Sequence, residues 1–196
     1  MTNKKYNTEE HNLFLFSDPH FMHRNLCKGT SVWPDKEKST RDFNTIEEMN
    51  QTIVDNINNK VGENDILYCL GDWSFSHPSN VRYFRGKLKV KTIHLILGNH
   101  DKVIRKNKDN VQSIFSSVQD YTEIQIDKQK IILCHYPIAR WRGMNRSTFM
   151  LHGHCHSKYQ GEGKILDVGI DSYYKLFGNY DSFSYEEIKE ILNNKQ

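Results

Sequence analysis

The chain has 196 residues, of which 26% are charged, and its formal net charge is only +3. This balance excludes a polybasic protein that coats nucleic acid, so any anionic partner must be recognised locally. The four cysteines form no C-x-x-C pair, which argues against a zinc ribbon or a dithiol redox site. The first dozen residues are polar and no apolar run approaches the ~20 residues that cross a bilayer. We therefore expect a cytoplasmic protein without a membrane partner, folded as a single domain over residues 1–196.

The first predicted strand covers Leu13–Ser17, where the apolar run L-F-L-F precedes the sequence D-P-H. The proline between Asp18 and His20 fixes its own φ and stiffens the turn, which suits a pair of ligands. His23 and Asn25 follow in the same loop and are candidate substrate-binding residues; the alternative is a polar surface loop.

Residues 27–44 are irregular in composition and predict a long loop or flap. A helix follows, because Thr45 and Glu48 form a capping-box pattern before apolar residues at helical spacing. The next strand, Ile66–Leu70, runs directly into a glycine and Asp72. A second strand thus ends in a turn followed by a carboxylate.

The segment Lys91–Asp101, K-T-I-H-L-I-L-G-N-H-D, repeats this pattern a third time. Its apolar residues predict a strand covered on both faces, as in parallel sheets. Gly98 is expected to permit a turn that lets Asn99, His100 and Asp101 point beyond the sheet edge. Three β-α units with polar residues at the same strand ends predict one shared crevice.

The second half of the chain changes character. Tyr121–Ile126 and Lys130–Cys134 predict an antiparallel pair of strands, and His135 follows the second strand. A short strand is expected within residues 164–169, and a capping box at Ser184 opens a closing helix.

The loop over residues 136–149 carries arginines among aromatic residues. Arg142 and Arg146 are candidates for pairing with phosphate, and Trp141 or Tyr136 for stacking on a base. In the alternative interpretation these arginines are surface residues and the tryptophan anchors the core.

Polar side chains at the ends of five predicted segments form one constellation. Carboxylate, imidazole and amide groups are ligands for Mn²⁺, Fe, Zn²⁺ or Ni²⁺, and two divalent ions fit their number. D-x-H and H-x-H each place two side chains on one side of an extended segment. The constellation consists of Asp18, His20, Asp72, Asn99, His100, His135, His154 and His156.

These motifs occur in a fixed order: D-P-H at 18–20, G-D at 71–72, G-N-H-D at 98–101, a lone histidine at 135, and G-H-C-H at 153–156. In this order the sequence resembles the calcineurin-like metallophosphoesterases, in particular their compact bacterial and phage members. The resemblance implies an α/β fold, namely a four-layer α-β-β-α sandwich of two mixed β-sheets flanked by helices.

The resemblance also implies a role for each residue of the constellation. One metal would be held by Asp18, His20 and His156, the other by Asn99, His135 and His154, and Asp72 would bridge both. His100 would be the proton donor, with Asp101 orienting its ring. His152 is not expected to be a ligand, since the matching positions are already filled.

The implied activity is hydrolysis of a phosphate ester by in-line attack of a metal-bridging hydroxide, with His100 as general acid. Manganese is the first choice for the two metals, with iron, zinc or nickel as alternatives. The arginine-rich loop favours phosphodiesters of nucleotide type, either nucleotides or short nucleic acids. The alternatives are a phosphomonoesterase and a catalytically weak metal-binding regulatory module. The sequence predicts no particular oligomeric state.

Overall fold

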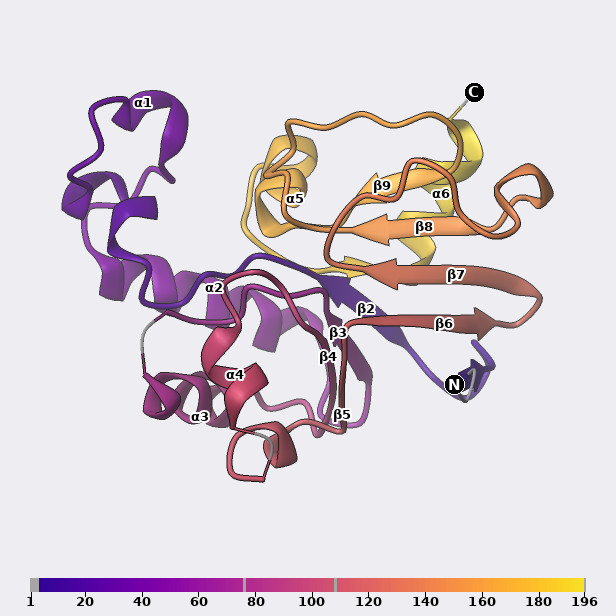
Figure 1. Cartoon of the computed structure of the whole chain (residues 1–196), viewed down its shortest axis with the longest axis horizontal. Coiled ribbons are helices and arrows are strands. Elements are labelled where there is room, and N and C mark those ends of the chain that lie inside the picture. The colour runs from indigo at the N-terminus through magenta and orange to yellow at the C-terminus, as the bar shows by residue number, and fades with distance from the viewer. Residues whose placement is uncertain (1–3, 76, 108, 196) are drawn as a thin grey trace.

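The computed structural model describes residues 4–75, 77–107 and 109–195. In this part of the chain two five-stranded β-sheets pack against each other and helices flank them (Figure 1). Both sheets are mixed in direction, since each contains parallel and antiparallel pairs. The predicted α/β architecture of two mixed sheets flanked by helices is confirmed.

The first sheet has the order β10-β2-β3-β4-β5. Its four parallel strands are β2 (Leu13–Phe16), β3 (Ile66–Cys69), β4 (Thr92–Ile96) and β5 (Ser117–Gln119), and β10 (Phe183–Ser184) is antiparallel to β2. Because β2, β3 and β4 are parallel neighbours, their carboxyl ends meet at one edge, as the repeated pattern predicted.

The second sheet has the order β1-β6-β7-β8-β9. It contains β1 (Lys4–Tyr6), β6 (Tyr121–Ile126), β7 (Gln129–Cys134), β8 (Phe149–His152) and β9 (Ile165–Asp167). The predicted antiparallel pair is β6 and β7, whereas β7, β8 and β9 are parallel. The ends of β7 and β8 therefore also meet at one edge.

The helices fall between the strands in the chain, except that α6 follows the last strand. They are α1 (Lys36–Ser39), α2 (Ile46–Lys60), α3 (Pro78–Lys87), α4 (Lys102–Lys106), α5 (Ile170–Phe177) and α6 (Tyr185–Asn194). Short 3-10 turns cover Arg24–Leu26, Lys28–Thr30, Gln112–Ile114 and Met144–Arg146. No helix in the described ranges is both long and apolar enough to span a membrane.

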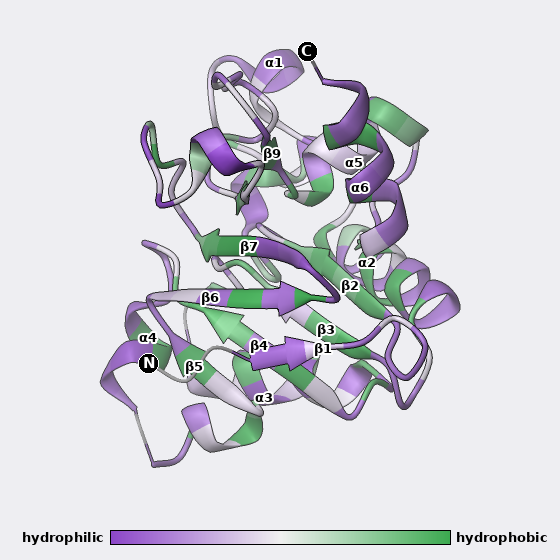
Figure 2. Ribbon diagram, turned by 90° about the vertical axis from the view of Figure 1, so that its right-hand side faces the viewer, coloured by the Kyte–Doolittle hydropathy of each residue, from purple (hydrophilic) through white to green (hydrophobic). Residues whose placement is uncertain are grey.

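Alternation along the strands sends side chains to both faces of the first sheet. Leu67 of β3 packs with α2 and α3, whereas Ile66 and Tyr68 pack between the two sheets. Burying one such aliphatic side chain stabilises the fold by about 1.5–3 kcal/mol. In Figure 2, β2 has largely hydrophobic colouring, and β7 is hydrophobic toward its carboxyl end and hydrophilic at its start.

The outer face of the second sheet is covered by the loop after β7. Trp141 is 8% exposed, packs with Ile132 and Met150, and donates from Nε1 to the Thr148 carbonyl at 2.9 Å. The tryptophan therefore anchors the core, the second of the two interpretations of this loop.

Helix capping follows the sequence at both predicted sites, with one difference. The Ser184 and Glu187 capping box of α6 is complete. At α2, Thr45 accepts from the Glu48 backbone N–H, but the Glu48 carboxylate accepts from the backbone N–H of Asn44 rather than that of Thr45. The glutamate thus reaches one residue beyond the expected position.

Candidate metal centre

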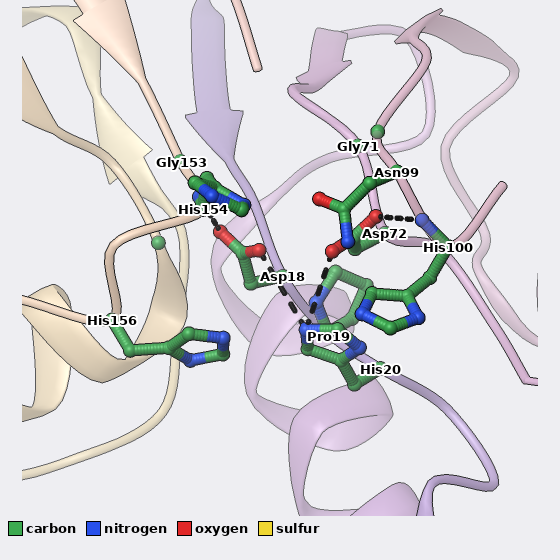
Figure 3. A network of polar contacts seen from close by, with 12 residues as sticks. Asp18, Pro19, His20, Gly71, Asp72, Asn99, His100, Gly153, His154 and His156 are labelled. Carbon is green, nitrogen blue, oxygen red and sulfur yellow. Dashed lines mark hydrogen bonds and ion pairs between the residues drawn. The ribbon is translucent and has the colours of Figure 1, made fainter. Parts of the chain in front are cut away.

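The carboxyl ends of strands from both sheets converge on one cluster of polar side chains. Asp18 follows β2, Asp72 follows β3 and Asn99 follows β4 in the first sheet, whereas His135 and the segment 153–156 follow β7 and β8 in the second. Figure 3 shows Asp18, Asp72, Asn99, His154 and His156 around a common centre. The structure brings all seven predicted ligands together.

The backbone at this cluster is strained. Five of the seven predicted ligands have left-handed φ angles although none is a glycine: Asp18 (57°), His20 (49°), Asp72 (55°), His154 (68°) and His156 (46°). Such a conformation costs of order 1–3 kcal/mol per residue and persists only where the surroundings impose it. Its concentration in these five residues points to a function that requires these side-chain directions.

Two groups of three side chains each have ligand atoms within 4.8 Å of one another. One group is Asp18, His20 and His156, and the other is Asp72, His135 and His154. Asp72 Oδ2 lies 3.6 Å from His20 Nε2 and 3.5 Å from His135 Nε2, so this carboxylate lies between the two groups. Asn99 Oδ1 lies 3.0 Å from His135 Nε2, beside the second group.

The hydrogen bonding of the buried polar atoms shows whether these residues suit a cation. Asp18 Oδ1 and both ring nitrogens of His20 are buried and have no hydrogen-bond partner among the residues that the structure describes. An unpaired buried polar atom costs ~1–3 kcal/mol, and a divalent cation would satisfy a carboxylate oxygen and an imidazole nitrogen together. The groups are possible metal-binding sites with oxygen and nitrogen donors.

Protonation within the cluster is set by burial and neighbouring charge. Burial lowers the pKa of His20 well below its usual value, which leaves a free lone pair. Burial opposes ionisation of Asp72, but the hydrogen bond and charge of His135 outweigh it and lower the pKa of Asp72 to about 2. Burial likewise opposes protonation of His135, yet Asp72 and Asp18 raise its pKa to about 9. A cation would have to displace this proton from His135.

A buried arginine connects the first group to the fold. Arg41 donates from Nε and Nη2 to the two carboxylate oxygens of Asp171, each at 2.8 Å. Its Nη2 also donates to the Asp18 carbonyl at 2.7 Å and its Nη1 to the Pro19 carbonyl at 3.0 Å. His156 Nδ1 lies 2.6 Å from Asp171 Oδ2, so its Nε2 remains available to bind a metal ion.

Sequence reasoning did not find Arg41, because a single arginine in an irregular loop carries no periodic signal. Its partner, Asp171, lies 130 positions further along the chain.

Glycines are required here for close approach. A Cβ on Gly98 would collide with the Asp72 side chain and backbone, and one on Gly153 would collide with Ser17 and Asp18. Gly98 does not adopt a left-handed φ, so the expected reason for this glycine, backbone freedom, is wrong. The carboxylate of Asp72 occupies the space that a side chain would fill.

In the described part of the chain, Asp101 forms no hydrogen bond with the ring of His100, contrary to expectation. Its carboxylate accepts from the backbone N–H groups of Asp72 (2.8 Å), Trp73 (2.9 Å) and Gly98 (2.8 Å). Although burial raises the pKa of Asp101 to about 6, these donors favour the carboxylate. Asp101 therefore joins the loops after β3 and β4.

The ring of His100 is placed by aromatic neighbours. Its centroid lies 5.1 Å from that of Phe75, 5.4 Å from that of His20 and 6.2 Å from that of His23. The His100 backbone N–H donates to Asp72 Oδ1 at 2.8 Å (Figure 3). The proposed acid is thus held next to the candidate bridging carboxylate.

The predicted substrate-binding residues lie in different places. His23 lies beside His20, with ring centroids 5.5 Å apart, whereas Asn25 Oδ1 accepts from the Val32 backbone N–H and holds its own loop. Arg142 and Arg146 line a hollow of about 640 Å³ that contains none of the candidate ligands. A substrate role for these two arginines stays a prediction, and it would require a substrate that reaches the outer face of the second sheet.

His152 and the cysteines lie outside both groups. His152 is 1% exposed and its Nδ1 lies 2.7 Å from the Gly153 carbonyl. Within the described residues, neither group includes His152 or a cysteine. The site therefore has the oxygen and nitrogen donors that the sequence indicated.

Relatives of the chain include an archaeal and a phage protein. The uncharacterized protein MJ1445 of Methanocaldococcus jannaschii is 31% identical over 157 residues, covering 79% of this chain and 75% of that protein. The Gene 66 protein of Mycobacterium phage L5 is 24% identical over 211 residues, covering 93% and 94%.

A solved structure has the same fold. The protein of unknown function AQ665 from Aquifex aeolicus superposes with a TM-score of 0.66 at 22% identity, covering 92% of this chain and 99% of that one. The family model of the calcineurin-like phosphoesterase superfamily domain matches residues 13–168, a span that contains all seven predicted ligands. The chain therefore belongs to the calcineurin-like phosphoesterase superfamily.

Proposed function

We propose that this protein is a cytoplasmic, single-domain, dinuclear metal-dependent phosphoesterase that hydrolyses phosphodiesters of nucleotide type. The observation that carries this proposal is the pair of ligand groups with Asp72 between them, in which buried atoms of Asp18 and His20 lack hydrogen-bond partners within the described ranges. The left-handed φ angles of five predicted ligands also support it, because the fold maintains backbone strain at these residues.

The residues of the first group, with Asp72, would hold one divalent ion, and those of the second group, with Asn99 and Asp72, the other. Mn²⁺ is the proposed ion, because carboxylate, imidazole and amide donors suit it. Two bound ions would supply a nucleophile at neutral pH and neutralise charge on the phosphoryl oxygens.

The protein's own acid would be His100. Its backbone is fixed by Asp72 and its ring by Phe75, so it can donate a proton to the leaving oxygen without a large rearrangement. Because the side chain is exposed, the proton can be replaced from solvent after each turnover.

The preference for diesters rests on aromatic rings at both ends of the cluster. Tyr136 is 45% exposed and its ring lies 4.8 Å from that of His154. At the other end, the rings of His23 and Phe75 lie 4.0 Å apart beside His20. A diester carries two substituents, and each would find an aromatic surface.

The test is turnover of bis(4-nitrophenyl) phosphate against 4-nitrophenyl phosphate by metal-depleted protein after Mn²⁺ addition. We expect two bound ions per chain and faster turnover of the diester, and Asp72→Asn should abolish both. A strong monoester preference would establish a phosphomonoesterase instead. One tightly bound ion without turnover would establish the metal-binding module.

A further inference from the structure

A second hollow, of about 360 Å³, lies beside the candidate metal centre. Its volume falls within the range of about 300–1,000 Å³ that is typical of small-ligand sites. One wall comes from the segment before α2, including α1, with Trp33, Lys38 and Arg41, and the other from His156, Lys158 and Asp171. His156 therefore belongs both to the first ligand group and to this wall.

The hollow has an excess of positive charge. Three cationic side chains line it, and Asp171 is the one carboxylate among the lining residues. Arg41 already binds both oxygens of Asp171, so this carboxylate does not compensate the lysines. In the described part of the chain neither Lys38 nor Lys158 forms an ion pair, and both are exposed. Both ammonium groups are therefore available to an anion.

Trp33 contributes an aromatic surface at the same place. Its ring is half-buried and its centroid lies 5.7 Å from that of His23, which in turn lies 5.5 Å from that of His20. The His20 and His156 rings are stacked 5.2 Å apart. Only the ring of His23 thus lies between the tryptophan and His20 of the first ligand group, and a substituent on a phosphate bound there can reach the tryptophan.

We propose that this hollow binds a nucleoside carrying a second phosphate, with its base on Trp33 and that phosphate between Lys38 and Lys158. This inference rests on the proposed phosphodiesterase function and names the substrate class: nucleotides or short oligonucleotides with a phosphate next to the scissile one. Base stacking and pairing of phosphate with ammonium groups are the interactions that recognise such a substrate.

The test uses two substrates that differ by one phosphate: thymidine 5′-(4-nitrophenyl phosphate) with and without a 3′-phosphate. In both, the oxygen of water binds phosphorus and its protons pass to the solvent, while the P–O bond to the aryl group breaks. The products are the nucleoside 5′-phosphate and 4-nitrophenolate, which leaves with the bonding electrons. We expect kcat/KM to be roughly five- to tenfold higher with the 3′-phosphate at low ionic strength.

The double variant Lys38→Gln/Lys158→Gln should bring this ratio close to one. Lys36→Gln is the matched control, because Lys36 lies in the same short helix, is exposed and does not line the hollow. A wild-type ratio of one, or a ratio that the double variant leaves unchanged, would overturn the proposal. Because the ratio compares two substrates with the same variant, a general loss of activity does not change it.

A binding measurement separates this inference from the proposed function. If Mn²⁺-loaded protein does not hydrolyse bis(4-nitrophenyl) phosphate, the proposed function fails, and calorimetry then tests the hollow directly. Thymidine 3′,5′-bisphosphate should bind roughly five- to tenfold more tightly than thymidine 5′-phosphate, and the double variant should abolish the difference. Equal affinities in the wild type would refute the second-phosphate site.

Trp33 provides an independent readout. Trp33→Ala should weaken binding of thymidine 3′,5′-bisphosphate by roughly tenfold, because stacking on a base is worth about 1–3 kcal/mol. Trp33→Phe should retain most of the affinity, since it keeps an aromatic face. If alanine and phenylalanine had the same effect, the base would not lie on this ring.

Discussion

Replacing Asp171 with asparagine tests how the buried arginine supports the candidate metal centre. Arg41 is 2% exposed and Asp171 18% exposed, and the variant leaves the guanidinium without its counter-charge. Breaking a buried ion pair from one side costs about 3–5 kcal/mol. We expect a loss of about 3 kcal/mol in the free energy of unfolding, because the asparagine oxygen keeps one hydrogen bond to Arg41.

The stabilisation by Asp171 depends on pH in a direction set by the pKa of its carboxyl group. Burial would raise the pKa of Asp171, but Arg41 and His156 hold it well below its usual range. The stabilisation is therefore present above the unfolded-state pKa, near 3.8, and is lost as the pH falls through the lower pKa of the folded state. The difference between wild type and variant should be full at pH 7 and smaller near pH 3.

Urea unfolding of metal-depleted protein, followed by circular dichroism, measures this difference. Asp35→Asn is the matched control, because Asp35 precedes α1, is exposed and makes no side-chain capping bond. Calorimetry with Mn²⁺ should also show about 10- to 100-fold weaker binding at the first group, since Asp171 supports His156. An equal loss of stability at both pH values, or a loss no greater than that of the control, would refute the reasoning.

Three further experiments address the acid, the cation and the core. His100→Asn should slow hydrolysis of a dinucleotide by ~10²–10⁴-fold and that of bis(4-nitrophenyl) phosphate much less, because nitrophenolate leaves without a proton; equal losses with both metals bound would refute the acid role. Mn²⁺ should raise the melting temperature more at pH 7.5 than at pH 5.5, because protons compete with the ion for His135 (pKa about 9) and Asp18 (pKa about 6). An equal rise at both pH values would contradict that competition. Ile53→Ala in α2 should cost about 2–5 kcal/mol in urea unfolding, since the side chain is fully buried.

Much of the first sheet was predictable because its strands are local patterns. β2, β3 and β4 are short apolar runs that end in glycine or turn residues, and their common direction followed from the intervening helical segments. β1, β5 and β10, each two or three residues long, escaped prediction. Strands this short are stabilised by pairing with distant segments and carry no periodicity of their own.

The helix α5 was not predicted either, although it carries Asp171. Its eight residues, I-D-S-Y-Y-K-L-F, contain aromatic residues that favour strands as readily as helices. Packing decided the outcome, since Ile170 enters the core beside the first sheet and Tyr173 the core between the sheets.

The sequence by itself determined which side chains form the cluster. The motifs D-P-H, G-D, G-N-H-D and G-H-C-H are each contiguous and each follow a strand, so chain geometry alone places their polar residues at strand ends. Their order along the chain carried the family resemblance, and the family is now shown.

Only the tertiary structure decided what surrounds the cluster. Arg41 and Asp171 meet across 130 residues, Asp101 binds backbone N–H groups rather than the ring of His100, and Trp33 reaches the wall beside His156. The physical reason is that these contacts join segments with no shared local pattern. Their geometry exists only once two sheets and the loop before α2 have packed together.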